Sequence, residues 1–499
     1  MTTSTSAPAR AAISTLAAVS AAAALVLALV LCRQALSDAI ATRAVVWGAL
    51  ALASYAAALL CLTGPRDDLS LGLARWKFGP WTLLWYGVTF GLATVTWSRP
   101  QISVAADIAV SSVLRALWLT AVGMTCLIGG YCAGPGEPLR QLARRGMATL
   151  SSRVTGTVRS RSTPWVLYAA GTAARLASTA TTGRFGYVGD AASAVSSATG
   201  YAQILTALTL LAPMAVCAAA VQVYWERQAG ARVTMTILFL TELIFGAAAG
   251  GKQSFIIAVL AIVIPMSAKR RRMPTAALIV VALFFLAVVV PFNQAYRNVA
   301  RSGSGTLSPS EAIHQAPGIL EQTLTGHSAL TLIPNSAFYL LQRVREIDSP
   351  AIIVQRTPGQ IAFSSPAQLV EAPFVSVIPR AVWAAKPILA SGYQFSQQYY
   401  GLPANVYTSS AITPVGDLYR HGGWIPVIAG MFLLGCAIRL LDDVLDVRAS
   451  PHAVFLILLL FPTLVKSEDD WVTLVAGIPE TLLIWLLVVA LTFRPRRAQ

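Results

Sequence analysis

The chain has 499 residues, of which 56% are hydrophobic and only 12% are charged, and its formal net charge is +16. Soluble domains carry about 25% charged residues, so the composition excludes an ordinary soluble protein and predicts a membrane protein with many spans. The basic residues lie mainly in short connections between apolar runs, as in cytoplasmic loops, so we expect no nucleic-acid partner. All six cysteines lie in or beside apolar runs, and neither disulfides nor a cysteine-based metal site is expected.

Apolar runs of about 20 residues, the length that crosses a bilayer as a helix, recur along the chain. In chain order the predicted spans are Ala11–Leu31, Ala44–Thr63, Trp81–Trp97, Ala109–Cys132, Trp165–Thr181, Tyr201–Val223, Val233–Ala249, Ser254–Ala268, Ala276–Phe292, Trp424–Leu441, His452–Val465 and Trp471–Phe493. The predicted fold is an all-α integral membrane protein with about twelve transmembrane helices and one large, partly helical extracytoplasmic loop. We divide it into N-terminal transmembrane helices (1–292, about nine), the loop (293–423) and C-terminal transmembrane helices (424–499, about three).

Lysine and arginine are distributed unequally between alternate connections, and this sets the predicted orientation. Alternate connections contain dense basic groups, such as Arg140 to Arg161, Lys269 to Arg272 and Arg494 to Arg497, whereas the remaining short connections contain only isolated basic residues. The asymmetry predicts that both termini are cytoplasmic and that the loop at 293–423 is external.

The external loop is predicted to be folded, because aromatic and β-branched residues recur throughout it. Helices are expected over Pro309–Thr323 and Ser336–Arg345, and a proline-broken, irregular segment with short helices over Pro350–Pro379. The polar and aromatic stretch Gln394–Tyr400 suits stacking on sugar rings and equally suits an ordinary surface helix.

Charged residues within or beside spans are functional candidates, because placing a charge in a bilayer is costly. Lys252 follows two glycines and predicts an anion site at the external surface; the alternative is a snorkelling lysine at a hairpin. Arg175 and Arg184 flank a hydroxyl-rich stretch that suits either a solvated cavity or a wet helix end. Glu242 is a candidate ion-pair partner for one of these arginines.

The external loop carries a second group of basic residues, and arginine is well suited to bidentate phosphate recognition. This group consists of Arg297, Arg301, Arg380, Lys386, Arg420 and His421. A carboxylate or a histidine is the usual acceptor for the proton of an attacking hydroxyl, so His421 and the external acids are candidate bases. No metal-ligand spacing and no P-loop, GxSxG or HExxH motif is present, so ATPase, hydrolase and zinc-protease functions lack support.

Several motifs together resemble the oligosaccharide repeat-unit polymerases of the Wzy type, the O-antigen polymerase-like family. They are GGK opening a span at Gly250–Lys252, the basic turn Lys269–Arg272, the span ending in FNQAYRN, and the loop motifs VIPRAVWAAKP and TPVGDLYRHGGW. The resemblance covers roughly Trp165 to Gly435. The chain departs from many relatives by having Lys252 where they have arginine, and lysine binds phosphate as a point charge rather than a fork.

The resemblance implies a multi-pass glycosyltransferase of the bacterial cytoplasmic membrane that polymerises repeat units into a cell-envelope or secreted polysaccharide, an exopolysaccharide. The implied substrate is a polyprenyl-diphosphate-linked oligosaccharide in contact with membrane lipid, with a flippase and a chain-length regulator as candidate partners and no cofactor or metal. On this interpretation the catalytic residues are Arg297, Arg380, Arg420 and His421. The substrate-binding residues are Arg175, Arg184, Lys252, Arg301, Lys386, Tyr399 and Tyr419.

Three alternatives remain open at the level of sequence. A glycan ligase of the same superfamily would move the glycan to a different acceptor. A transporter or flippase of lipid-linked glycans would also need charges inside the membrane. A glycosyltransferase that uses a lipid-phosphate sugar would need an acidic pair in the first external loop, where only Asp38 is found. Convergence of the cations at one external site favours a transferase, and a line of charges through the membrane favours transport.

Overall fold

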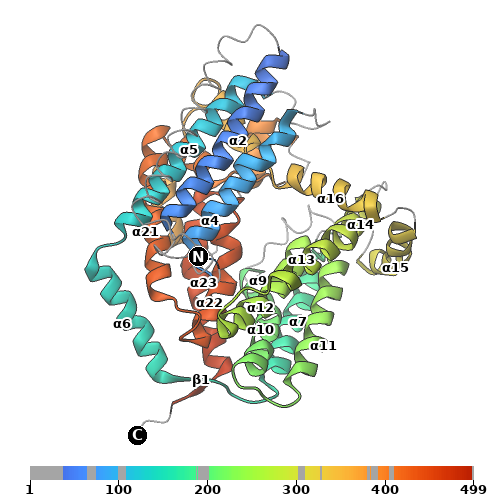
Figure 1. Cartoon of the computed structure of the whole chain (residues 1–499). Coiled ribbons are helices and arrows are strands. Elements are labelled where there is room, and N and C mark those ends of the chain that lie inside the picture. Colours follow the sequence, from blue (N-terminus) through green and yellow to red (C-terminus); the bar gives the residue numbers. More distant parts are fainter. Residues whose placement is uncertain are drawn as a thin grey trace, which may run out of the picture.

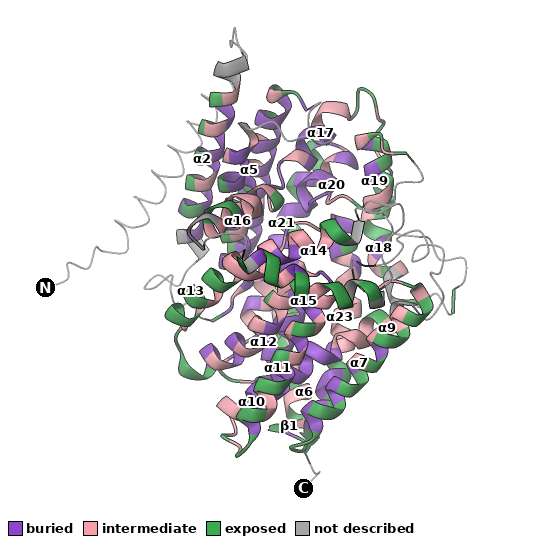
Figure 2. Cartoon of the chain, turned by 90° about the vertical axis from the view of Figure 1, so that its right-hand side faces the viewer, coloured by how far each residue is buried: buried purple, intermediate pink, exposed green. Residues whose placement is uncertain are grey.

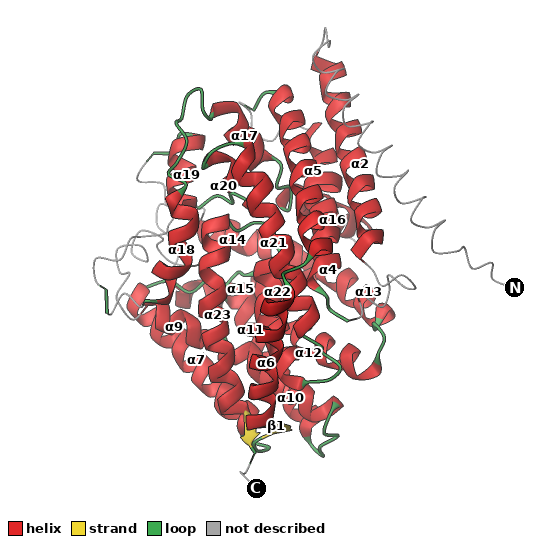
Figure 3. Cartoon of the chain, turned by 90° about the vertical axis from the view of Figure 1, so that its left-hand side faces the viewer, coloured by secondary structure: helices red, strands yellow, loops and turns green. Residues whose placement is uncertain are grey.

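The computed structural model describes residues 38–63, 73, 75–98, 108–186, 188, 202–301, 309–325, 329–378, 382–383, 391–403 and 409–496. These residues are mostly helical, with almost no sheet (Figures 1 and 3). In chain order the elements are α2 (Asp38–Thr63), α4 (Phe78–Tyr86), η1 (Gly87–Gly91), η2 (Leu92–Ser98), α5 (Val110–Ala133), α6 (Glu137–Arg153), β1 (Val154–Val158), α7 (Thr163–Thr182), α9 (Ala202–Thr209), α10 (Leu211–Tyr224), α11 (Ala231–Ala248), α12 (Lys252–Arg270), α13 (Thr275–Phe284), η4 (Phe285–Val289), α14 (Val290–Arg301), α15 (Pro309–Thr325), α16 (Ala329–Arg343), α17 (Asp348–Arg356), α18 (Ala367–Val377), α19 (Ser391–Tyr400), α20 (Pro414–Arg420), α21 (Trp424–Val444), α22 (Pro451–Val465), α23 (Trp471–Thr492) and β2 (Phe493–Pro495).

Eight helical stretches in the described part of the chain are long and apolar enough to cross a membrane, which indicates a membrane protein. They are Thr42–Leu60, Val110–Ala133, Ile204–Tyr224, Ala231–Ala248, Lys252–Arg270, Thr275–Val299, Trp424–Val444 and Trp471–Thr492. Each corresponds to a predicted span, and the sixth of them continues beyond the predicted end at Phe292.

The predicted count of about twelve spans is not confirmed. The first predicted span, Ala11–Leu31, lies outside the described residues. Trp81–Trp97 is helical but is divided between α4, a π-helix and a 3-10 helix, while α22 has only 15 residues. Trp165–Thr181 lies within α7, a continuous helix of 20 residues. Threonines and serines interrupt its apolar sequence, and α7 is not among the eight candidate spans.

One group of helices, α2, α4, α5 and α21, is packed through small residues. A side chain at Gly130 of α5 would collide with the Phe432 carbonyl of α21, and one at Gly435 of α21 would collide with the Leu127 carbonyl of α5. The first backbone N–H groups of α4 donate to the Asp442 carboxylate of α21, at 2.7 Å from Phe78 and 3.0 Å from Gly79. Asp442 therefore caps α4 from another helix.

A second group contains α7, α10, α11, α12, α22 and α23. Almost every residue of α10 and α22 is buried, so these two helices lie inside the packed helices. Gly171 lets α7 approach the backbone of α10 at Ala212, and Gly246 lets α11 approach Ser254 of α12.

Several of the basic segments predicted to be cytoplasmic lie at one end of the molecule. β1 pairs with β2 in an antiparallel sheet, which brings the connection after α6 beside the end of α23 (Figure 1). The Arg159 N–H donates to the Thr492 carbonyl at 2.7 Å, and the Val158 N–H donates to Glu226 at 2.6 Å. Segments that the charge asymmetry assigned to the same side of the membrane are therefore in direct contact.

The predicted external loop is folded and largely helical where it is described. The expected helices at Pro309–Thr323 and Ser336–Arg345 are found as α15 and α16, with α16 beginning earlier, at Ala329. The proline-rich segment contains two short helices, α17 and α18, and Gln394–Tyr400 lies within α19. Figures 2 and 3 place α17, α19 and α20 at the opposite end of the molecule from β1.

Candidate functional site

The turn between α11 and α12 is the point where two predicted site residues meet. Gly250 has a φ of +66°, which glycine adopts without strain, and Gly251 precedes Lys252, the first residue of α12. From α14, the Arg297 Nε donates to the Gly250 carbonyl at 2.9 Å. The Tyr296 hydroxyl donates to the Ala248 carbonyl at 2.8 Å, so α14 is attached to the end of the same hairpin.

A third basic residue, on α16, lies near this turn. The Lys252 ammonium lies over the Tyr339 ring, 4.3 Å from its centroid, which is a cation–π contact. Arg343 is one helical turn after Tyr339, and both Arg297 and Arg343 are close enough to act electrostatically on Lys252. We call Lys252, Arg297 and Arg343 the cationic cluster. Arg343 was missed by the sequence analysis because α16 had not been placed against α12.

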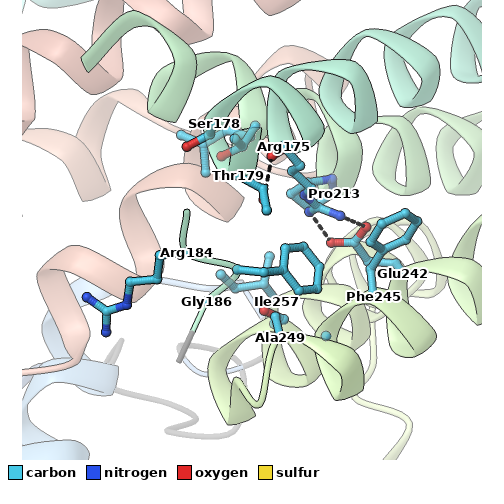
Figure 4. Close-up of a pocket in the computed structure, with 15 residues that line it drawn as sticks. Arg175, Ser178, Thr179, Arg184, Gly186, Pro213, Glu242, Phe245, Ala249 and Ile257 are labelled. Atoms are coloured by element: carbon cyan, nitrogen blue, oxygen red, sulfur yellow. Dashed lines mark hydrogen bonds and ion pairs between the residues drawn. The ribbon is translucent and has the colours of Figure 1, made fainter. Parts of the chain in front are cut away.

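A cavity of about 280 Å³ opens beside this turn, between α7, α10, α11 and α12 (Figure 4). Ser254, in the first turn of α12, lines it. Gly186 also lines the cavity, and a side chain at this position would collide with Ala249 at the end of α11. The cavity and the cationic cluster therefore share the α11–α12 turn.

Arg175 and Glu242 form a bidentate ion pair across this cavity. The two guanidinium nitrogens donate to the two carboxylate oxygens at 2.7 and 2.5 Å, joining α7 to α11 (Figure 4). Glu242 is 2% exposed, and its buried carboxylate is paired with Arg175. The ion pair expected from the sequence is therefore present. Arg184 also lines the cavity, and its guanidinium points away from the pair (Figure 4). Its buried Nε has no hydrogen-bond partner among the described residues.

The remaining lining combines hydroxyls with aromatic rings. Ser178, Thr179 and Thr209 contribute hydroxyl groups, and the rings of Phe185 and Phe245 meet edge to face at 6.3 Å. Such a lining offers hydrogen bonds and apolar ring contact together, which suits a polyhydroxylated ring.

A buried carboxylate follows the cationic cluster along the chain. Glu346 is 4% exposed and lies three residues after Arg343, and its N–H donates to the Thr89 carbonyl at 3.3 Å. Burial, and then the nearby Glu468 carboxylate, raise the pKa of Glu346 well above its usual range. The Glu468 carboxylate is itself paired with Lys466 at 2.8 Å. Both acids lie in segments predicted to be external, but their proximity depends on tertiary packing, because Glu346 and Ser467 both bond to Thr89 of η1.

A family described as a domain of unknown function, DUF8712, matches residues 185–445, more than half of the chain. The chain belongs to the DUF8712 family. The matched region includes Glu242, the cationic cluster and Glu346, whereas Arg175 and α6 precede it. No curated protein and no solved structure matches the chain.

Near the end of the DUF8712 match, Arg420 and His421 lie in a compact polar unit around Asp417. The Arg420 Nε donates to Asp417 Oδ1 at 2.6 Å, and Asp417 Oδ2 accepts from the Val472 N–H at 3.1 Å. His421 is fully buried, with Nδ1 at 2.7 Å from the Asp417 carbonyl and Nε2 at 3.2 Å from Gln368. These bonds join α20 to α18 and α23, and the catalytic roles of Arg420 and His421 stay predictions.

The other predicted residues of the DUF8712 region are distributed as follows. Tyr399 is 1% exposed, its hydroxyl bonds to Thr357 at 2.7 Å, and its ring packs on Phe395. Tyr419, in α20, contacts the rings of Phe363 and Trp424. Arg301 ends α14, one turn beyond Arg297, while Arg380 and Lys386 lie outside the described residues.

Within the described ranges, no three histidine, cysteine or acidic side chains are grouped so that they could hold a metal ion. Metal independence therefore stays a prediction from the sequence, where lysine and arginine are expected to neutralise the phosphates.

Proposed function

We propose that this protein is a membrane glycosyltransferase that polymerises polyprenyl-diphosphate-linked oligosaccharide repeat units on the outer face of the bacterial cytoplasmic membrane. The observation that supports this most is the meeting of Lys252 and Arg297 at one turn, with Arg343 on α16 close enough to act electrostatically on Lys252. Three cations from three helices suit a diphosphate, which presents several negative oxygens at once.

In the proposed reaction, a hydroxyl of the acceptor sugar attacks the anomeric carbon of the donor glycan. A new carbon–oxygen bond forms, the bond from the anomeric carbon to the diphosphate breaks, and polyprenyl diphosphate leaves. The cationic cluster stabilises the charge that grows on the leaving diphosphate. The hydroxyl proton passes to a base, for which Glu346 is our candidate because it lies three residues after Arg343 of the cationic cluster.

The cavity beside the cluster is proposed to hold a sugar ring of the substrate. Its volume of about 280 Å³ and its hydroxyl and aromatic lining suit one ring, and the shared α11–α12 turn puts that ring next to the phosphates. Arg175 and Arg184 would then contact the glycan, the substrate-binding role predicted from the sequence.

The test is polymerisation by purified protein supplied with a synthetic polyprenyl-diphosphate oligosaccharide, with product lengths read by mass spectrometry. We expect Lys252→Ala, Arg297→Ala and Arg343→Ala each to reduce the rate about 10²–10³-fold, the effect of losing one preorganised donor. Lys252→Arg should keep part of the activity because the charge remains. Arg232→Ala, at the other end of α11, is the matched control.

Full activity in all three alanine variants would reject the diphosphate site. Transfer of glycan to a different acceptor without chain lengthening would support a ligase. A transporter or flippase is the second candidate, because the Arg175–Glu242 pair places charges between two helices of the membrane region. It predicts no new glycosidic bond in detergent but movement of labelled lipid-linked glycan across vesicles.

A further inference from the structure

The helix α6 has the sequence pattern of a helix with one apolar face and one basic face. Its apolar residues recur at spacings of three and four, which places them on one side of the helix. They are Leu139, Leu142, Ala143, Gly146, Met147 and Leu150. Arg140, Arg144 and Arg145 project from the rest of the circumference, and no residue of α6 is buried.

Both ends of α6 are attached where membrane-crossing helices end. At its beginning, α6 follows α5, and the Arg140 Nε lies 3.4 Å from Asp443 in the last turn of α21. At its end, α6 passes into β1, which pairs with the residues directly after α23. A helix of 17 residues is about 25 Å long, which is enough to connect the end of α21 to the end of α23 along a membrane surface.

Figure 1 shows α6 leaving the end of α5 and running outside the helical bundle to β1. Only part of its apolar face is covered by protein. Met147 and Leu150 pack against the main core, whereas Leu139 is 49% exposed and Leu142 is 67% exposed. Arg144, Arg145 and Arg153 are exposed beside them. An apolar edge and a row of guanidinium groups therefore remain uncovered.

We propose that α6 lies in the headgroup layer of the membrane and that its arginines bind anionic phospholipids. Leu139 and Leu142 insert between the acyl chains, and Arg144, Arg145 and Arg153 contact lipid phosphates, as in amphipathic helices at anionic bilayer surfaces. Exposed Arg494 and Arg496 on and beside β2 add positive charge at the same end of the molecule. This inference is independent of the proposed enzymatic function.

The test uses the full-length chain, with its native cysteines replaced by alanine and a fluorophore attached at Leu142→Cys, in lipid nanodiscs. One set contains a small fraction of brominated phosphatidylglycerol in phosphatidylcholine, and the other contains the same fraction of brominated phosphatidylcholine. Bromine quenches a nearby fluorophore, so the ratio of quenching in the two sets measures local enrichment of the anionic lipid. We expect a ratio well above one.

The variant Arg144→Gln/Arg145→Gln should bring the ratio close to one, since each basic residue near an anionic surface contributes about fivefold. Arg144→Lys/Arg145→Lys should retain most of it. Arg227→Gln/Arg232→Gln removes one exposed charge from the α10–α11 connection and one from the first turn of α11, and should leave the ratio unchanged. Equal quenching by both lipids in the unaltered chain would overturn the proposal. Absence of quenching by either lipid would also overturn the proposal and would indicate that this face of α6 binds a soluble acidic partner instead.

Discussion

Lys252 and Arg420 are both basic residues at helix ends, but their surroundings differ. The Lys252 ammonium lies on an aromatic ring beside two further cations, an arrangement open to an anionic ligand. The Arg420 guanidinium is bonded to Asp417, which is fully buried and also accepts from the backbone of α23. Residue type alone did not separate these two situations.

Arg420→Ala is expected to destabilise the protein. It would leave the buried Asp417 carboxylate without its charged partner, a change that costs about 3–5 kcal/mol when a buried pair is broken. Thermal unfolding of the purified variant in detergent should show a clearly lower Tm and reduced abundance in the membrane. The exposed Arg232→Ala serves as the control and should change stability by about 0.5 kcal/mol or less. Lost polymerisation at an unchanged Tm would instead support the catalytic role for Arg420.

Glu346 predicts a particular dependence of stability on pH. The charged groups that act on it are Glu468, Arg343, Lys466 and Asp348, and burial is the largest cause of its raised pKa. The folded state therefore binds this proton more tightly than the unfolded chain, and stability falls as pH rises from about 4.3 to the raised folded-state pKa.

Glu346→Gln should remove this loss. The variant is expected to be more stable than the unaltered protein at pH 8, because the neutral amide carries no charge that burial and the Glu468 carboxylate would disfavour. Thermal unfolding measured from pH 5 to pH 8 would detect it, with Glu371→Gln on the exposed face of α18 as the control. A pH profile identical to that of the unaltered protein would contradict the assignment.

At the scale of elements, close helix contacts depend on glycines that hydropathy does not distinguish from alanine. α5 and α21 approach so closely that Gly130 and Gly435 each face a backbone carbonyl of the other helix. Small residues allow such approach between membrane helices, where van der Waals packing rather than water exclusion drives association.

Gly435→Ala is expected to force α5 and α21 apart and to cost about 1–3 kcal/mol, the usual penalty for overpacking. The matched control is Gly477→Ala in α23, where an added methyl group would meet nothing within 4 Å. That change should be neutral or slightly stabilising, because alanine favours helix more than glycine does. Thermal unfolding in detergent measures both, and equal Tm values would refute the close-packing argument.

At the scale of the whole molecule, basic segments gather at the end that contains β1 and β2, while α17, α19 and α20 lie at the other end (Figures 2 and 3). The positive-inside rule assigns the first end to the cytoplasm. The cationic cluster, at the opposite end of α12 from the basic residues Lys269 and Arg270, then faces the outer side.

Single cysteines introduced into a cysteine-free chain should report this orientation in intact cells. Gly359→Cys, in the exposed turn between α17 and α18, should react with a membrane-impermeant maleimide added outside. Ala229→Cys, in the exposed turn between α10 and α11, should react only after the membrane is permeabilised. The reverse pattern would invert the topology and place the cationic cluster in the cytoplasm.

The sequence by itself determined the membrane class, the eight spans that correspond to apolar helices, and the helices α15 and α16 of the segment predicted to be external. It also located Lys252 at the start of a helix after a glycine turn. These features depend on local composition, since a run of about 20 apolar residues favours the bilayer wherever it packs.

Only the tertiary structure decided which charged residues act together. Arg297 meets Lys252 because α14 crosses the α11–α12 turn, and Arg343 joins them because α16 packs nearby. Arg420 instead bonds to Asp417, a residue only three positions away. Charged side chains interact over a few ångströms, so their partners are set by which helices pack together, and hydropathy along one helix carries no information about its neighbour.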